Sequence, residues 1–170
     1  IQEQDVRPLT MAVLKGYMSP MWPGSVNYVS APALAQERGI DVKELRSNEP
    51  TDFVNKITVR ATSADEEHAV AGTILGASDP RIVELDGYRI DAVPQGVMLF
   101  LANEDKPRIV GALGSLIGEA GINIANMTLG RKEPGSPAVT VLNLDAPVND
   151  ELLEKVKNID HVMDVRQVEL

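Results

Sequence analysis

The spacing of hydrophobic and polar residues changes along this chain from a helical to an alternating pattern. In the first fifty residues it predicts short helices over 8–15 and 31–38. Pro8 suits a first helical turn, where its missing N–H costs nothing, and Gly39 suits the left-handed residue that closes a helix. The segment 16–25 between them is rich in glycine and proline and is predicted to be a loop.

From Phe53 onward, apolar and polar residues alternate with period two, which is the pattern of half-buried strands. The expected strands cover residues 53–61, 68–75, 81–85 and 88–92. The last two flank Asp86-Gly87, and an Asp-Gly pair between apolar runs is the strongest short signal for a hairpin turn. Residues 1–94 are therefore predicted to form one module, in which two helices precede a mostly antiparallel sheet.

Residues 97–170 carry a second pattern, which predicts the order strand, helix, strand, strand, helix, strand. The expected elements cover residues 97–101, 107–120, 124–129, 138–144, 150–158 and 162–168. Asn149 is placed to cap the second helix. This order gives a four-stranded antiparallel sheet with both helices on one face, the ferredoxin-like arrangement. The whole chain is thus predicted to be α+β with two modules.

The predicted helix over 107–120 has an apolar arc beside an arc of glycines. The apolar arc contains Ile109, Val110, Leu113, Leu116, Ile117 and Ala120. The glycine arc contains Gly111, Gly114 and Gly118, and each glycine destabilises a helix by roughly 1 kcal/mol relative to alanine. Close approach of another backbone would explain these glycines, and simple tolerance by the packed sheet would explain them as well.

Composition and charge exclude several classes of function. The chain has 170 residues, a net charge of −9 and a pI near 4.7, so it offers no basic face to the phosphates of a nucleic acid. It contains no cysteine, which excludes thiolate metal sites and is compatible with the reducing cytoplasm. No apolar run approaches the roughly 18 residues of a membrane span. Because the chain starts at Ile1, without an initiator methionine and inside an established pattern, we interpret it as part of a longer protein.

No catalytic or cofactor motif is found in the sequence. The only histidines, His68 and His161, fall in different modules, and neither accompanies a nucleophile motif or metal-ligand spacing. The glycines from Gly111 to Gly118 do not form a dinucleotide fingerprint and lie inside a predicted helix. We therefore predict no catalytic, cofactor or metal site in these residues.

The predicted strand-to-helix turn at 103–107 carries the strongest binding signal. Asp105 stands just before a helix N-terminus, and Asn123 returns on the next strand. A carboxylate can hold an ammonium, whereas free helix N–H groups and an amide can hold a carboxylate, so this combination suits a small zwitterion such as an amino acid. Asp105 could equally cap the helix, and Asn123 could be a turn residue.

These residues also carry a resemblance to a known family. The βαββαβ order, with Asn103, Asp105 and Pro107 at the first turn and Gly121-Ile122-Asn123-Ile124 after the helix, resembles the ACT domain, an amino-acid-sensing regulatory module. The wider chain is similar to the regulatory end, an intervening domain plus an ACT domain, of the long-form D-3-phosphoglycerate dehydrogenase family. That similarity is carried by residues 7–10, 26–29, 71–73, 86–88, 91, 164–165 and 169–170.

The resemblance implies that L-serine is an effector and that the chain self-associates through its ACT sheets. It implies that Asp105 binds the serine ammonium, that Asn103 lies near the ligand and that Asn123 reaches it from a neighbouring subunit. Arg108 stands where the family usually has glycine, so its side chain could hinder binding or supply a cation to the carboxylate. The parent enzyme would use NAD to oxidise 3-phosphoglycerate in segments absent from this chain.

Other interpretations stay open at this point. Arg60, Arg81 and Arg89 could form an anion site, since the related domain is described as an allosteric substrate-binding unit, or they could belong to a solvated face. The chain could instead be the regulatory domain of an iron–sulfur L-serine dehydratase, although it contains no cysteine cluster. It could also be a ligand-free oligomerisation module in which Asp105 only caps a helix.

Overall fold

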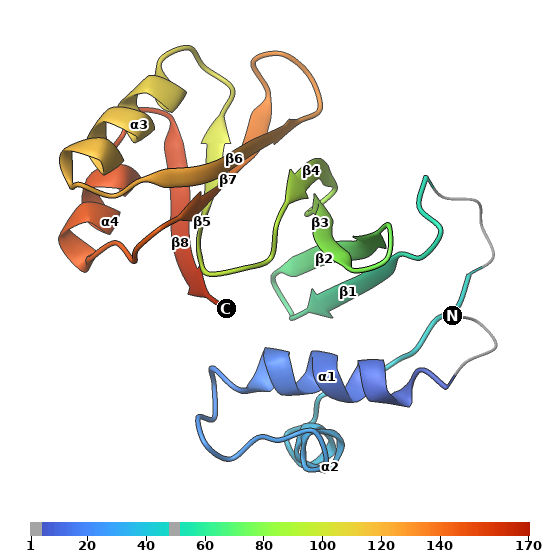
Figure 1. Ribbon diagram of the computed structural model, residues 1–170. Coiled ribbons are helices and arrows are strands. Elements are labelled where there is room, and N and C mark those ends of the chain that lie inside the picture. The colour runs from blue at the N-terminus through green and yellow to red at the C-terminus, as the bar shows by residue number, and fades with distance from the viewer. Residues whose placement is uncertain (1–4, 48–51) are drawn as a thin grey trace. The chain divides into compact units, whose positions relative to one another are not determined.

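The computed structural model describes residues 5–47 and 52–170 (Figure 1). Two compact units divide the described chain at the step from Asn55 to Lys56, and each unit has a hydrophobic core of its own. Ile1, from which we interpreted the chain as part of a longer protein, lies outside the described residues. The module boundaries expected from the sequence, 1–94 and 97–170, stay predictions.

The first unit is built from two helices, α1 (Arg7–Met18) and α2 (Ala31–Glu37). Helix α1 continues three residues beyond its predicted end at Lys15, so the expectation of a loop from Gly16 was wrong at its start. The reason is that Met18 is fully buried against Ala31 and Ala35 of α2, and this burial outweighs the low helix propensity of a glycine.

The second unit begins with a four-stranded antiparallel meander, sheet A. Its strands are β1 (Ile57–Thr62), β2 (Glu67–Leu75), β3 (Asp79–Leu85) and β4 (Tyr88–Ala92), in the order β1-β2-β3-β4. Asp86 and Gly87 both have positive φ, 48° and 79°, as a type I′ hairpin turn requires, so the predicted hairpin is confirmed. Strand β1 begins at Ile57 rather than at Phe53. Val54 is almost fully exposed, so its side chain contributes no burial that would favour a strand there.

The rest of this unit forms sheet B with its two helices. The elements are β5 (Val97–Glu104), α3 (Ile109–Glu119), β6 (Ile124–Arg131), β7 (Pro137–Leu144), α4 (Asp150–Lys157) and β8 (Val162–Glu169). The strand order β6-β7-β5-β8, with α3 and α4 on one face (Figure 1), is the ferredoxin-like arrangement. Asn149 accepts a hydrogen bond from the Leu152 N–H at 2.8 Å, so the predicted cap of α4 is confirmed. The α+β class is also confirmed.

Helix α3 buries a narrower stripe than the sequence predicts. Ile109, Leu113 and Ile117 are buried, whereas Val110 is 52% exposed. The glycine arc of α3 has no neighbour within 4 Å of any added Cβ, so close approach of another backbone within this chain does not explain it.

The glycine that does face a close backbone is Gly130 on β6. A Cβ added there would lie 2.5 Å from the carbonyl oxygen of Arg89 on β4. Strand β4 crosses the face of sheet B opposite the helices, where Ile90 and Ala92 pack against Met98, Val139 and Val141. Helices and β4 therefore cover the two faces of sheet B, as Figure 1 also shows.

The linker between the two sheets is fastened by Asn143 of β7. Its side-chain amide donates hydrogen bonds to the carbonyls of Val93 at 2.9 Å and Gln95 at 3.0 Å. Asn143 is buried, so these bonds form away from water and hold β4 close to the start of β5.

Candidate functional site

Asp105 lies just beyond β5, at the turn that leads into α3, and its side chain is only 19% exposed. The carboxylate oxygen Oδ2 accepts a hydrogen bond from Arg131 Nη1 and a second from the Gly135 N–H at 3.2 Å. The Arg131 guanidinium, followed by the Gly135 N–H, holds the pKa of Asp105 below its usual range. The residue that the sequence singled out is thus an ionised carboxylate at neutral pH.

The hydrogen bonds of Asp105 also show whether it caps helix α3. Both of its bonding partners belong to the end of β6 and the loop that follows, and no side chain in the described part of the chain caps α3. The N-cap position is taken by Arg108, which has a φ of 80°. The alternative in which Asp105 caps α3 is therefore not what the structure shows, and the first N–H groups of α3 face the turn that carries Asp105.

Arg108 has the backbone conformation that glycine adopts most readily. A φ of 80° lies in the left-handed region, which glycine adopts freely and an L side chain adopts at a cost of roughly 1–2 kcal/mol. Arg108 accepts that strained conformation, so the turn keeps the backbone path that a glycine would give it. Its side chain is exposed.

Asn103 lies in the same corner but is buried, with 1% of its surface exposed. Its Oδ1 accepts a hydrogen bond from the Thr140 hydroxyl at 2.9 Å, and its Nδ2 donates to the Glu104 carbonyl at 2.8 Å. Both ends of the amide are therefore engaged within the sheet. Whether Asn103 also touches an effector stays a prediction.

Asn123 lies at the opposite end of sheet B from Asp105. It directly precedes Ile124, which pairs with Leu144, whereas the other end of β6 pairs through Arg131 with Ala138. Seven residue steps along β6 separate these two pairs, which places Asn123 roughly 20 Å from the corner of Asp105. The Asn123 amide donates a hydrogen bond to Asp145 Oδ2 at 3.0 Å. One chain therefore does not bring Asn123 and Asp105 together.

The three arginines of the predicted anion site lie on three different strands of sheet A. Arg60 on β1 forms an ion pair with Glu67, and Arg81 on β3 pairs with Asp79 and with Asp91. The Arg81–Asp91 distance is 3.0 Å. Arg60 and Arg81 thus face acids rather than each other, and the anion site stays a prediction.

Arg89, the third of these arginines, lies on β4 and is paired across the hairpin with Glu84. Its carbonyl oxygen is the atom that meets Gly130 of β6, so its backbone position is fixed by the contact between the two sheets. The structure places it one strand away from Arg81.

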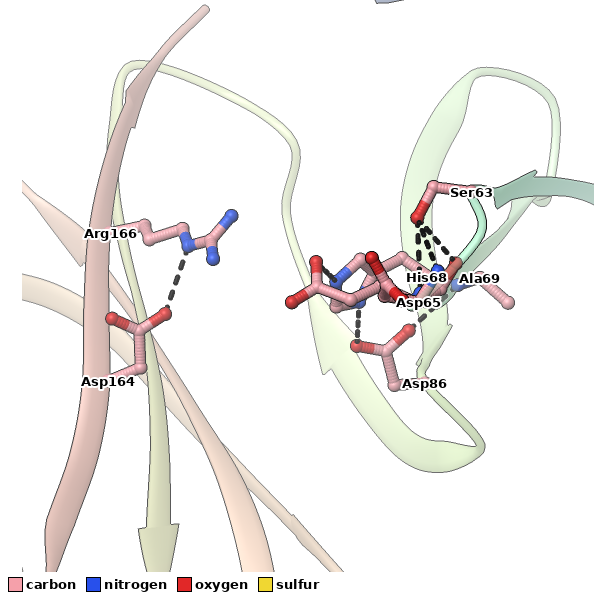
Figure 2. A network of polar contacts seen from close by, with 8 residues as sticks. Ser63, Asp65, His68, Ala69, Asp86, Asp164 and Arg166 are labelled. Carbon is pink, nitrogen blue, oxygen red and sulfur yellow. Dashed lines mark hydrogen bonds and ion pairs between the residues drawn. The ribbon is translucent and has the colours of Figure 1, made fainter.

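His68 is the centre of the polar network in Figure 2, on the surface of sheet A. Its Nδ1 lies 3.0 Å from Asp86 Oδ2, and its Nε2 lies 3.7 Å from Glu66 Oε2. The hydrogen bond to Asp86 is the main cause that raises the pKa of His68, and the charge of Arg166, which pairs with Asp164, acts in the opposite direction. The hydroxyl of Ser63, also drawn in Figure 2, bonds to backbone atoms of Asp65 and Glu66 rather than to His68, so these contacts describe an ion-pair cluster and not a nucleophile–base pair.

Neither a metal-ligand cluster nor a membrane-spanning helix is found among the described residues. Within residues 5–47 and 52–170, no group of three or more histidine, aspartate or glutamate side chains is arranged to hold a metal ion. None of the helices in the described part of the chain is long and apolar enough to cross a membrane.

Arg131 is the residue that the sequence did not single out. It lies in a charged, glycine- and proline-rich stretch that reads as an ordinary loop, and only the register of the β6–β7 hairpin brings it to Asp105. The one signal for Arg131 in the sequence was a charged residue directly after a glycine near the end of a predicted strand. This signal is weak.

Two family models match successive parts of this chain. The family model of the D-3-phosphoglycerate dehydrogenase intervening domain matches residues 1–86, and that of the ACT domain matches residues 97–161. The resemblance drawn from the sequence is thereby confirmed.

Individual relatives match almost the whole chain. A D-3-phosphoglycerate dehydrogenase of Methanocaldococcus jannaschii is 38% identical over 159 residues, covering 94% of this chain and 30% of the relative. That of Synechocystis sp. is 36% identical, covering 96% of this chain and 30% of the relative. That of Bacillus subtilis is 32% identical, covering 95% of this chain and 31% of the relative. The chain spans less than a third of the length of these relatives. It belongs to the D-3-phosphoglycerate dehydrogenase intervening domain family and carries an ACT domain after that intervening domain.

Proposed function

We propose that this chain binds L-serine as an allosteric effector between the ACT domains of two chains. Asp105 supports the proposal because its carboxylate is ionised, partly buried and placed at the strand-to-helix turn. An ionised carboxylate in such a place binds an ammonium, and the uncapped N-terminus of α3 offers N–H groups to a carboxylate.

The observation that carries the proposal is the separation of Asp105 and Asn123 at opposite ends of sheet B. An effector that touches both residues must bridge two chains whose ACT sheets run in opposite directions, so that the start of one β6 meets the far end of the other. Effector binding and self-association are then one event, and the effector stabilises the paired state by mass action.

Arg108 does not count against this proposal. The strained backbone at Arg108 preserves the turn that a glycine would form, so the geometry around Asp105 is retained. The side chain of Arg108 is exposed, and the contact that Asp105 makes with a guanidinium is with Arg131.

The chain is proposed to act as the regulatory part of a longer D-3-phosphoglycerate dehydrogenase in L-serine biosynthesis. In that protein the oxidation of 3-phosphoglycerate with NAD would take place in segments that this chain does not cover. The described residues do not fit NAD, since the glycines at 111, 114 and 118 lie within α3 rather than at a strand-to-helix turn. The chain's own contribution would be to restrain domain movement when serine is bound.

Calorimetric titration of L-serine, with glycine and D-serine as comparison ligands and light scattering for mass, tests the proposal. We expect saturable L-serine binding at about one site per chain in a dimer. Asp105→Asn should weaken binding by roughly 10- to 100-fold, because an ionic hydrogen bond is lost. Asp164→Asn, which removes a carboxylate from the Arg166 pair on β8, serves as the matched control. A dimer that binds no L-serine would instead identify a ligand-free oligomerisation module.

A further inference from the structure

The two oxygens of the Asp105 carboxylate have different surroundings. Oδ2 accepts the hydrogen bonds from the Arg131 guanidinium and the Gly135 N–H. From the residues that the structure describes, no hydrogen bond or ion pair reaches Oδ1. Arg131 therefore orients this carboxylate through one oxygen and leaves the other to accept from a further donor.

The backbone at Arg131 is fixed from two sides. Arg131 is the last residue of β6 and pairs with Ala138 of β7. The residue before it, Gly130, lies directly against the β4 backbone at Arg89. The guanidinium consequently extends from a well-anchored strand end rather than from a free loop, and 48% of the side chain stays exposed to receive a ligand.

The Asp105–Arg131 pair presents a negative and a positive charge side by side. An α-amino acid presents an ammonium and a carboxylate on the same carbon, which is the complementary arrangement. A guanidinium has five N–H donors in a planar fork, and one N–H already bonded to Asp105 leaves others for a second carboxylate. The pair can thus bind both ends of a zwitterion without separating.

We propose that Arg131 binds the α-carboxylate of the effector while Asp105 binds its ammonium, so that the pair selects α-amino acids over amines that lack a carboxylate. This inference rests on the proposed function and adds to it the residue that determines specificity. Arg131 is assigned this role rather than Arg108 because the Arg131 guanidinium contacts Asp105. No contact within the described residues joins Arg108 to Asp105.

The test compares L-serine with L-serinamide, which keeps the ammonium and replaces the carboxylate by a neutral amide. Binding to the full chain is measured by calorimetry for the unaltered protein and for Arg131→Gln. We expect the unaltered chain to prefer L-serine. Because Arg131 also orients Asp105, Arg131→Gln can weaken the binding of both ligands, but it should weaken L-serine binding roughly 10- to 100-fold more than L-serinamide binding. The variant should therefore lose the preference itself.

Three further variants keep this test decisive. Arg131→Lys keeps a positive charge but lacks the planar guanidinium fork, so it should retain part of the preference for L-serine. This variant replaces Arg131→Gln if circular dichroism shows that Arg131→Gln does not fold. Arg108→Gln and Arg166→Gln remove other exposed cations and should leave the preference intact. Any of three results would overturn the assignment of Arg131. These results are an unchanged preference for L-serine in both Arg131 variants, tighter L-serine binding by Arg131→Gln, and loss of the preference in Arg108→Gln. If the unaltered chain binds no L-serine, the proposed function itself fails.

Discussion

The two sheets of the larger unit differ sharply in burial. In sheet B, every residue of β7 after Pro137 is buried, because helices cover one face of the sheet and β4 covers the other. In sheet A, no residue of β1 is buried, and its burial only alternates between half-buried and exposed. A strand with apolar neighbours on both faces makes many more dispersion contacts than a strand open to water.

This difference indicates how the two sheets depend on each other. The best-buried residues of β4, Ile90 and Ala92, find their fully buried apolar partners on sheet B, whereas Ile82 and Leu85 of sheet A are only partly buried against this cluster. The contact at Gly130 allows the two backbones to approach closely enough for that burial. We infer that sheet B is stable through its own core, whereas sheet A is stabilised mainly through β4.

The largest expected effect on stability compares a core substitution in sheet B with a substitution in sheet A. Leu142→Ala removes a fully buried side chain from the core of sheet B and should lower the free energy of unfolding by about 3–5 kcal/mol. Ile57→Ala on β1, which is 39% exposed, should lower it by no more than about 1 kcal/mol. Urea denaturation of both variants measures these values. Similar losses in the two variants would contradict the comparison.

A smaller effect is expected at the contact between the sheets. Gly130→Ala places a Cβ against the carbonyl oxygen of Arg89, and neither backbone can move aside easily, so we expect a loss of about 1–3 kcal/mol. The matched control is Gly118→Ala in α3, where nothing lies within 4 Å and alanine should stabilise the helix by about 0.5–1 kcal/mol.

Both glycine variants are measured by urea denaturation, with limited proteolysis to show which sheet opens. Faster cleavage within sheet A of Gly130→Ala, at an unchanged rate within sheet B, is the expected pattern. If the two glycine variants changed stability equally and in the same direction, β4 would not couple the sheets.

The smallest effect concerns pH and the turn of sheet A in Figure 2. The pKa of His68 is raised above its ordinary value of 6.5, chiefly by the hydrogen bond to Asp86, with Glu66 adding to the effect and Arg166 opposing it. Protonated His68 therefore favours the folded state. Its contribution to the free energy of unfolding is fully present below the pKa that histidine has in the unfolded chain. This contribution is lost as the pH rises through the higher pKa that His68 has in the folded chain.

Asp86→Asn tests this dependence because asparagine tolerates the positive φ of 48° and can still accept the hydrogen bond from the Ala69 N–H. The variant should be less stable than the unaltered chain at about pH 5.5, and this difference should shrink by about pH 8.5. Thermal unfolding at both pH values measures it. In a His68→Gln background the pH dependence should vanish, and its persistence there would place the titrating group elsewhere.

The sequence predicted the parts of the fold that depend on local patterns. The order of strands and helices in sheet B follows from period and turn signals, and the Asp86-Gly87 hairpin and the Asn149 cap were found where those signals placed them. The start of β1 and the end of α1 were missed. At Val54 an alternating pattern has no surface to pack on, and at Met18 burial between helices extends α1 past a glycine.

The candidate site was predictable only in part. Asp105 could be selected because a carboxylate just before a helix either caps the helix or binds a ligand. Asn123 could be selected because its amide follows the turn at Gly121. The register that places them at opposite ends of sheet B depends on strand pairing between residues distant in the sequence, so no local pattern indicates it. Arg131 could not be selected, since it lies 26 positions after Asp105, and helix α3 and strand β6 separate the two residues in the sequence.

The sequence alone determined the α+β class, the βαββαβ order and the acidic character of the turn before α3, because each depends on residues that are neighbours along the chain. Only the tertiary structure decided that β4 closes the second face of sheet B, that Gly130 rather than the α3 glycines meets another backbone, and that Arg131 pairs with Asp105. These contacts join residues distant in the sequence. Their energies depend on how two surfaces fit, which no local pattern records.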